Sequence, residues 1–181
     1  MEKDVSSKPA DLSYISAELL LKAEMDEYRV EDAKNQNMNT RSGIFISFAS
    51  AVFLFSINSI VGSDIFVTNA SSCWAFSAHL AAIIIIVVGE GVLLYSLNIF
   101  IKVCTPTIYR RIRFEDFLNF TSKPTDLFAM SLCMVYKDAI SHNRIVNCRK
   151  ATYLQQGIAL LKYAVICISL GFSLLKFVKY L

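Results

Sequence analysis

Residues 83–97 read IIIIVVGEGVLLYSL, in which one acid, Glu90, interrupts a long apolar run. The run lies in a stretch from Cys73 to Ile101 that contains no other Asp, Glu, Lys or Arg. A helix that crosses a bilayer needs about 20 predominantly apolar residues, so this stretch is long enough to span a membrane. The segment therefore predicts a transmembrane helix that contains a carboxyl group.

Two other stretches have a similar character. Residues 42–63 lie uncharged between Arg41 and Asp64. Residues 157–181 contain three lysines, and this stretch spans a membrane only if Lys162 and Lys176 extend their ammonium groups toward the two interfaces. Hydrophobic residues make up 55% of the 181-residue chain, above the roughly 45–50% that is usual for soluble domains. We therefore expect three transmembrane helices.

The placement of Lys and Arg predicts the orientation. The short loop of residues 62–72 has neither residue type, whereas residues 102–156 contain nine. Cytosolic loops carry the excess of positive charge, so the N-terminus and the middle segment are predicted to be cytosolic. The net charge of the whole chain is only +3, which predicts no strong bulk attraction to nucleic acid.

These patterns predict an all-α membrane protein with about three transmembrane helices, N-terminal and central cytosolic helices, and an oligomeric bundle. We expect four segments: a cytosolic N-terminal amphipathic helix (1–42), a transmembrane hairpin (43–103), a cytosolic basic linker and helix (104–156), and a third transmembrane helix (157–181). The polar run NQNMNT at 35–40 is a weak helix former and a candidate hinge. The arginines and aromatic residues that follow Pro106 are a candidate amphipathic segment on the inner membrane surface.

Glu90 has three competing interpretations. A charged acid near the centre of a span costs about 2.5–3.5 kcal/mol on insertion scales, so such residues face a bundle interior, a partner or water. Glu90 lines an oligomeric pore, or it is a protonated or ion-paired structural contact, with Lys162 or His79 as partner, or it lies close enough to the inner interface to be solvated. Gly89 and Gly91 would let another helix or water approach the backbone closely.

Other polar residues fall within the predicted spans. Hydroxyl and amide side chains on a transmembrane helix either form hydrogen bonds between helices or line a wet lumen, and both alternatives stay open here. The predicted pore-lining or intramembrane polar residues are Glu90, Ser47, Ser50, Asn58 and Lys162.

A basic cluster lies in the cytosolic part. It is explained either by the positive-inside pattern with contact to anionic lipid or by a phosphate-binding surface for a nucleotide or oligonucleotide, on which Tyr109, Phe114 or Phe117 would stack. Its members are Arg110, Arg111, Arg113, Lys123, Arg144, Arg149 and Lys150.

Motifs of catalysis are absent from the sequence. It contains no phosphate-binding P-loop, no G-x-S-x-G and no H-E-x-x-H. The five cysteines are scattered, without a C-x-x-C pair or a spacing typical of a metal site. We therefore expect no enzyme, no cofactor and no bound metal.

Two segments resemble a known group of proteins. AKNQNMNTRSGIFISFASAVFLF (33–55) is a polar helix that enters the first span, and MVYKDAISHNRIVNCRKATYLQQGIALLKYAVICISL (134–170) is a helix that enters the last. Together they resemble the small bacterial transmembrane effectors of anti-phage systems, namely those of Pycsar and CBASS operons, SLATT-type proteins and the membrane component of Hailong. The resemblance implies a homo-oligomer in the bacterial inner membrane that stays quiet until infection.

The resulting hypothesis is an oligomeric inner-membrane effector of anti-phage defence. It would form an ion-conducting pore or permeabilise the membrane, gated by a nucleotide or oligonucleotide. Implied partners are membrane lipids, further copies of the chain, such a ligand, and an operon-encoded enzyme that synthesises it. The alternative is a non-conducting membrane scaffold or accessory subunit that recruits a partner through its cytosolic helices.

Overall fold

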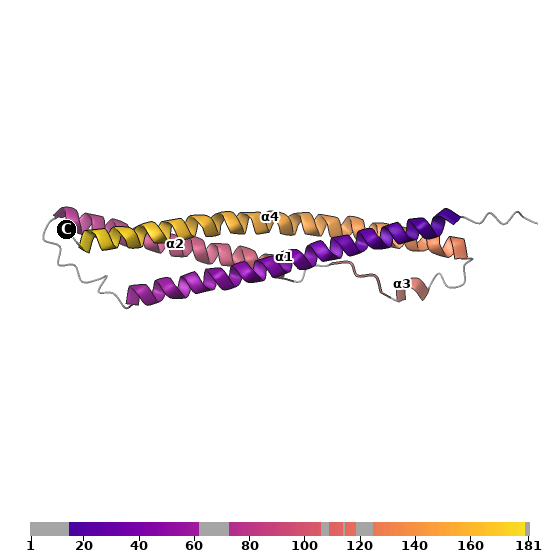
Figure 1. Cartoon of the computed structure of the whole chain (residues 1–181), viewed down its shortest axis with the longest axis horizontal. Coiled ribbons are helices and arrows are strands. Elements are labelled where there is room, and N and C mark those ends of the chain that lie inside the picture. Colours follow the sequence, from indigo (N-terminus) through magenta and orange to yellow (C-terminus); the bar gives the residue numbers. More distant parts are fainter. Residues whose placement is uncertain (1–14, 62–72, 106–108, 114, 119–124, 180–181) are drawn as a thin grey trace, which may run out of the picture. The chain divides into compact units, whose positions relative to one another are not determined.

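The computed structural model describes residues 15–61, 73–105, 109–113, 115–118 and 125–179, and all regular structure among them is helical. The helices are α1 (Ile15–Val61), α2 (Cys73–Cys104), α3 (Glu115–Leu118) and α4 (Thr125–Lys179) (Figure 1). Three of them, α1, α2 and α4, are long and apolar enough to cross a membrane. The predictions of an all-α fold and of three candidate spans are therefore confirmed.

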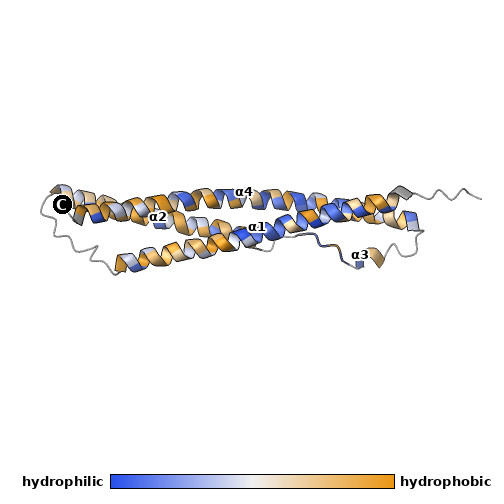
Figure 2. Ribbon diagram, in the orientation of Figure 1, coloured by the Kyte–Doolittle hydropathy of each residue, from blue (hydrophilic) through white to orange (hydrophobic). Residues whose placement is uncertain are grey.

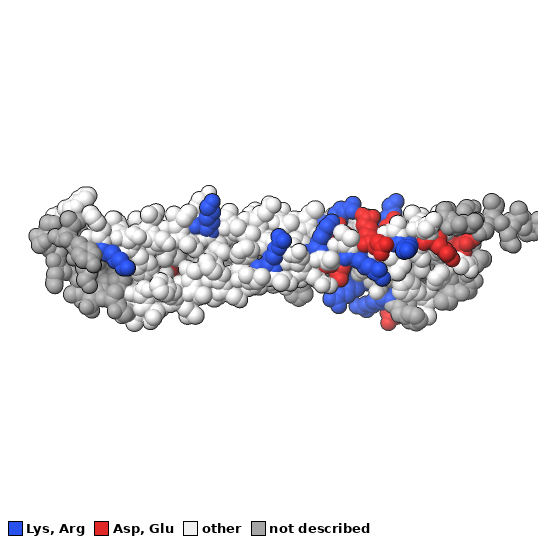
Figure 3. Space-filling view, in the orientation of Figure 1, with Lys and Arg blue, Asp and Glu red and all other residues white. Residues whose placement is uncertain are grey.

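The chain divides into two compact units. One consists of Met1–Ala33 and Tyr109–Ile145, and the other of Lys34–Ile108 and Val146–Leu181. Charged side chains gather in the first, which we call the charged unit (Figure 3). In the second, the apolar unit, α2 and the C-terminal parts of α1 and α4 are predominantly hydrophobic (Figure 2).

The helix α1 continues without a break through residues 35–40, so the candidate hinge is not a break in the helix. The side chains of Asn35 and Asn39 explain the difference, because both accept hydrogen bonds from Lys150 of α4. Tertiary contacts override a weak helix propensity in this way. The predicted boundary between a cytosolic helix and a third span is likewise not a break, since α4 is one helix.

Small side chains recur every seven residues along the buried faces of the apolar unit. The series are Ser42, Ala49 and Ser56 in α1, Ala75, Ala82, Gly89 and Ser96 in α2, and Gly157, Ala164 and Gly171 in α4. A seven-residue repeat keeps one face of a helix turned toward its neighbour, and small residues let the backbones approach closely. The repeat therefore explains the close packing of these three helices.

Large side chains pack onto the glycines of this repeat. A Cβ added at Gly89 would lie 2.8 Å from Cγ1 of Ile168, and one added at Gly157 would lie 2.6 Å from Cε1 of Phe100. These contacts join α2 to α4 in antiparallel order. They also place Phe100 in the core cluster formed by all three long helices.

The described part of the basic stretch after Pro106 contains little helix. Residues 109–113 have no helical structure, and α3 is only four residues long. The backbone N–H and C=O of Arg110 form hydrogen bonds with the side chain of Asn143 instead of with a helix of their own. This segment is therefore fixed by α4 and not by local helix formation.

Candidate functional site

Glu90 lies on α2 beside the closest contact between α2 and α4. Both of its carboxylate oxygens are buried, and neither has a hydrogen-bond partner among the residues that the structure describes. Gly89 allows the close approach that the sequence predicted, whereas a Cβ added at Gly91 would meet nothing within 4 Å. The carboxyl group is therefore enclosed within the chain, and only one of its two flanking glycines is needed for helix packing.

Ser56 of α1 lies at the same level of the apolar unit as Glu90. The rings of Phe45 and Phe100 stack with centroids 5.3 Å apart, and the thiol of Cys104 donates to the carbonyl oxygen of Asn39 at 3.8 Å, so α1 and α2 are antiparallel. Ser56 lies the same number of residues after Phe45 as Gly89 lies before Phe100. In two antiparallel helices this spacing places Ser56 level with Gly89, the neighbour of Glu90.

The hydroxyl of Ser56 is buried and has no hydrogen-bond partner in the described part of the chain. Since both helices rise about 1.5 Å per residue, this hydroxyl and the Glu90 carboxyl group occupy one level of the span. We call this level, defined by Ser56 and Glu90, the intramembrane polar layer.

The other polar residues predicted for the spans lie apart from this layer. Ser47 is exposed and donates to the carbonyl of Gly43 in its own helix at 3.1 Å, Ser50 is half-buried, and Asn58 is exposed. Lys162 is exposed on α4, and no ion pair joins it to Glu90 in the described residues. One chain therefore does not gather the predicted intramembrane residues into a single face.

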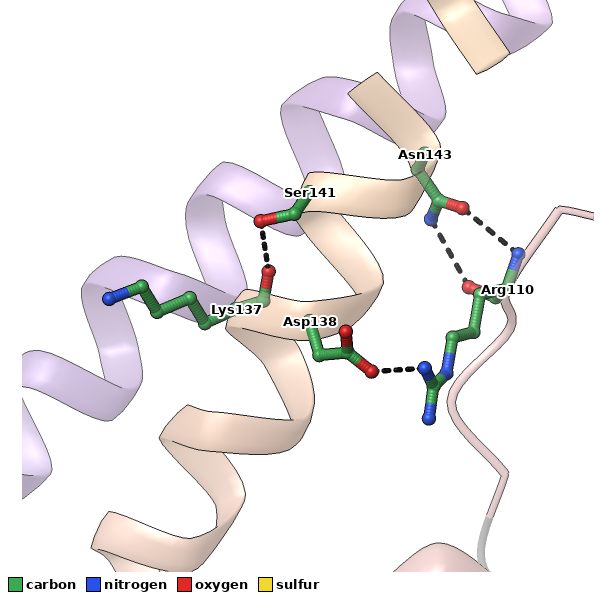
Figure 4. A network of polar contacts seen from close by, with 5 residues as sticks. All are labelled: Arg110, Lys137, Asp138, Ser141 and Asn143. Carbon is green, nitrogen blue, oxygen red and sulfur yellow. Dashed lines mark hydrogen bonds and ion pairs between the residues drawn. The ribbon is translucent and has the colours of Figure 1, made fainter. Parts of the chain in front are cut away.

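Asn143 holds the basic segment of the charged unit against α4. Its side-chain oxygen accepts from the backbone N–H of Arg110 at 2.9 Å, and its amide nitrogen donates to the carbonyl of Arg110 at 3.1 Å (Figure 4). The hydroxyl of Tyr28 in α1 donates to the same carbonyl at 3.3 Å. The guanidinium of Arg110 pairs with Asp138. Residues of α1 and of α4 thus both fix the position of Arg110.

Arg144 connects α4 to α1 within the charged unit. It forms an ion pair with Glu27, and its Nε lies 3.7 Å from a carboxylate oxygen of Glu31, which is only 2% exposed. Carboxylates of α1 and a guanidinium of α4 therefore pair within one chain.

The structure separates the predicted basic cluster. Arg110 and Arg144 pair with carboxylates, Arg111 and Arg113 are exposed on the segment that Asn143 holds, and Lys123 and Phe114 lie outside the described residues. Arg149 is exposed on the apolar unit. Exposed guanidinium groups can bind phosphate groups, whether of a lipid or of a nucleotide.

Lys150 does not lie on the exposed surface expected for a phosphate-binding side chain. It is 4% exposed, and its Nζ donates to Oδ1 of Asn35 at 2.9 Å and to Oδ1 of Asn39 at 3.0 Å. Burial lowers the pKa of this ammonium from its ordinary value, opposed by the nearby Cys104. The sequence analysis missed this contact, although two asparagines one turn apart in a charged helix were its signal.

Metal-binding side chains do not gather in the described ranges, where no group of three His, Cys, Asp or Glu residues could hold an ion. All five cysteines are free thiols. No protein-family model, no curated protein and no solved structure matches the chain.

Proposed function

We propose that this chain is a homo-oligomeric effector of the bacterial inner membrane that conducts ions or permeabilises the membrane. The charged unit would lie in the cytosol, as the distribution of Lys and Arg between residues 62–72 and 102–156 predicts. The proposal rests above all on Glu90, whose two carboxylate oxygens are buried in a candidate span and have no hydrogen-bond partner among the described residues.

An ionised carboxylate in a span requires a counter-charge, a hydrogen-bond donor or water. Neither Lys162 nor any other described residue provides one to Glu90, which leaves water or a second copy of the chain. The hydroxyl of Ser56 at the same level also has no hydrogen-bond partner in the part of the chain that the structure describes. In our proposal, water reaches the intramembrane polar layer when the helices separate, and ions follow the hydrated path.

Lys162 supports an assembly of several copies. It is exposed on α4 in a stretch whose neighbouring surface includes exposed Tyr163, Ile166 and Leu170. Lipid can cover the apolar side chains, but an ammonium on that surface needs an interface or a polar neighbour. Another copy of the chain can supply that neighbour.

The packing around Glu90 corresponds in this proposal to the resting, non-conducting form. Its carboxylate oxygens are enclosed by the chain's own helices, so conduction requires a rearrangement that admits water to them. The resemblance to anti-phage effectors adds the trigger, a nucleotide or oligonucleotide released on infection. Arg111 and Arg113, exposed on the segment held by Asn143, are the proposed contacts for its phosphates.

Purified protein in liposomes and in planar bilayers tests the proposal. We expect wild-type protein to conduct and Glu90→Gln to change the conductance or the preference for cations, because a fixed charge is lost from the path. Glu115→Gln removes the same charge from an exposed position on α3 and is the matched control. Unchanged conductance and selectivity in Glu90→Gln would contradict a role in the path.

The same variants can be expressed under control in bacteria with a dye that reports membrane potential. Loss of potential and arrest of growth are expected for the wild type once the signal is supplied. Normal potential and growth with every candidate nucleotide would contradict the effector hypothesis.

A non-conducting scaffold is the second candidate, because the charged unit exposes large apolar side chains. Leu127, Met130 and Met134 recur at intervals of three and four on α4, and Met134 is 68% exposed. Outside a membrane such a strip is typical of a protein-binding surface. The oligomeric state in detergent discriminates the two functions, since a monomer that assembles only with a different protein favours the scaffold.

A further inference from the structure

A buried lysine joins α1 to α4 at the end of the apolar unit where the candidate spans begin. Lys150 Nζ donates to Oδ1 of Asn35 and to Oδ1 of Asn39, at 2.9 and 3.0 Å. The two asparagines are one helical turn apart, so both reach the same ammonium. Ser42, the first residue of the uncharged stretch of α1, follows within the next turn.

The helix α2 reaches this place as well. The thiol of Cys104, the last residue of α2, donates to the backbone carbonyl of Asn39 at 3.8 Å. Asn35, Asn39, Cys104 and Lys150 thus form one polar layer to which all three long helices contribute, and we call it the lysine layer. A displacement of α1 along its axis has to break the bonds of this layer.

The lysine layer places a charged side chain at a core position of the apolar unit. Lys150 belongs to a series of buried positions on α4 at alternating intervals of four and three, which continues through Leu154, Gly157, Leu161, Ala164, Ile168 and Gly171. A polar residue at a core position of such a series specifies how the helices are aligned, at a cost in stability.

Only neutral oxygens accept from the ammonium, since no ion pair of Lys150 occurs among the described residues. A buried charge held without a counter-charge is easily released to water. Apolar contacts gain nothing comparable from water, so the lysine layer is a place where the contact between α1 and α4 can open.

We propose that the lysine layer is a latch that holds α1 against α4 in the resting form, and that its release lets α1 move and admits water to the intramembrane polar layer. The entry of water that follows release rests on the proposed function, whereas the latch itself concerns only the contact between α1 and α4. Its two states can therefore be measured without recording any current.

Two sets of substitutions should act in opposite directions. Asn35→Ala with Asn39→Ala leaves the ammonium without acceptors and should favour the released state. Asn35→Leu with Asn39→Leu and Lys150→Met replaces the polar layer by apolar side chains and should favour the latched state, because apolar replacement of a buried charged group is often neutral or stabilising. Lys102→Met makes the same type of change at an exposed position and is the control.

The first measurement is the distance between spin labels at Thr40→Cys and Thr152→Cys, two exposed positions on α1 and α4 of the apolar unit. The native cysteines are replaced by serine in every variant and in the reference protein, and a serine at position 104 keeps a donor for the carbonyl of Asn39. The second is potassium efflux from liposomes that contain the full-length chain. Relative to wild type, we expect the alanine pair to lengthen and broaden the distance distribution and to raise efflux about tenfold, a common size for one conformational coupling. The apolar set should narrow the distribution and lower efflux, and Lys102→Met should change neither.

The outcomes separate the latch from the proposed function. Distance distributions that are the same in both sets overturn the latch, whatever the efflux. Distances that shift as expected while no protein conducts support the latch and overturn the proposed conduction. If the alanine pair fails to fold, the apolar set still tests the latch, because a distance distribution broader than that of wild type would contradict it.

Discussion

Ser96 of α2 donates a hydrogen bond to the backbone carbonyl of Gly157 in α4, with the hydroxyl oxygen 2.8 Å from the carbonyl oxygen. Both residues are buried. The bond is possible because Gly157 has no side chain between the two helices, where Phe100 already occupies the space next to its Cα. A small donor on one helix and a glycine on the other thus determine how α2 and α4 meet.

Ser96→Ala should lower the free energy of unfolding by about 0.5–1.5 kcal/mol, the usual net contribution of one hydrogen bond. The measurement is unfolding of the purified protein in detergent. Ser173→Ala is the matched control, since the exposed hydroxyl of Ser173 donates at 2.8 Å to Ser169 of its own helix. Equal losses in the two variants would contradict a specific role for the contact between helices.

Gly89→Ala should be destabilising because the new methyl group has no space. It would lie 2.8 Å from Cγ1 of Ile168 and 3.2 Å from the backbone nitrogen of the same residue. Overpacking of this kind costs about 1–3 kcal/mol. We expect a lower midpoint of thermal unfolding than in wild type, measured in detergent.

Gly91→Ala is the control for that substitution. Nothing lies within 4 Å of a Cβ at this position, and alanine favours a helix over glycine by about 1 kcal/mol. We therefore expect Gly91→Ala to be neutral or stabilising in the isolated chain. A large destabilisation there would mean that another molecule packs on Gly91.

The long helices, and their continuation from polar segments into the spans, could be predicted from the sequence, but the contacts that hold residues 35–40 in a helix could not. Uncharged stretches around Glu90 and after Arg41 were sufficient to predict spans, because hydrophobic length is a local property. The candidate hinge at residues 35–40 was wrong as a break in the helix, because its low propensity is compensated by a lysine more than a hundred residues later. Contacts at such separations are not encoded in local propensity.

The candidate site was predictable only in part. Glu90 could be predicted because an acid in an apolar run is rare. That Ser56 lies at the same level as Glu90 could not, because this depends on the register between α1 and α2. The repeat of small residues every seven positions was visible in the sequence and would have predicted the packing seam. Lys150 lies seven residues before Gly157, on the same face of α4. The repeat therefore predicts that Lys150 is buried and does not belong to a surface cluster.

Asn143→Ala should free the basic segment of the charged unit. The variant loses two hydrogen bonds, to the N–H and the C=O of Arg110, and these backbone groups then depend on water (Figure 4). We expect hydrogen exchange at the amide of Arg110 to accelerate strongly and the free energy of unfolding to fall by about 1–3 kcal/mol. Native-state hydrogen exchange measures the first effect.

Ser141→Ala is the control for Asn143→Ala. Ser141 is exposed on the same helix, and its hydroxyl donates at 2.8 Å to the carbonyl of Lys137, so its removal leaves Arg110 unaffected (Figure 4). Exchange at Arg110 that is equally slow in Asn143→Ala and in Ser141→Ala would show that Asp138 and Tyr28 alone hold the segment.

The dependence of stability on alkaline pH should report the burial of Lys150. Burial lowers the pKa of this ammonium in the folded chain below its ordinary value of 10.5. Between those two pKa values the unfolded chain binds more protons than the folded chain, so this group makes stability rise with pH in that window. Below the folded pKa the same group is protonated in both states, and its contribution to the slope disappears.

Lys150→Met removes this contribution to the slope, whereas Lys102→Met, at an exposed position, should retain it. The measurement is the midpoint of unfolding in detergent from about pH 8 to about pH 10.5, compared between each variant and wild type so that other titrating groups cancel. The stability of Lys150→Met relative to wild type should fall as the pH rises through this range, because only the wild type gains stability from this group. A difference that stays constant across the range would contradict the lowered pKa of Lys150 in the folded chain.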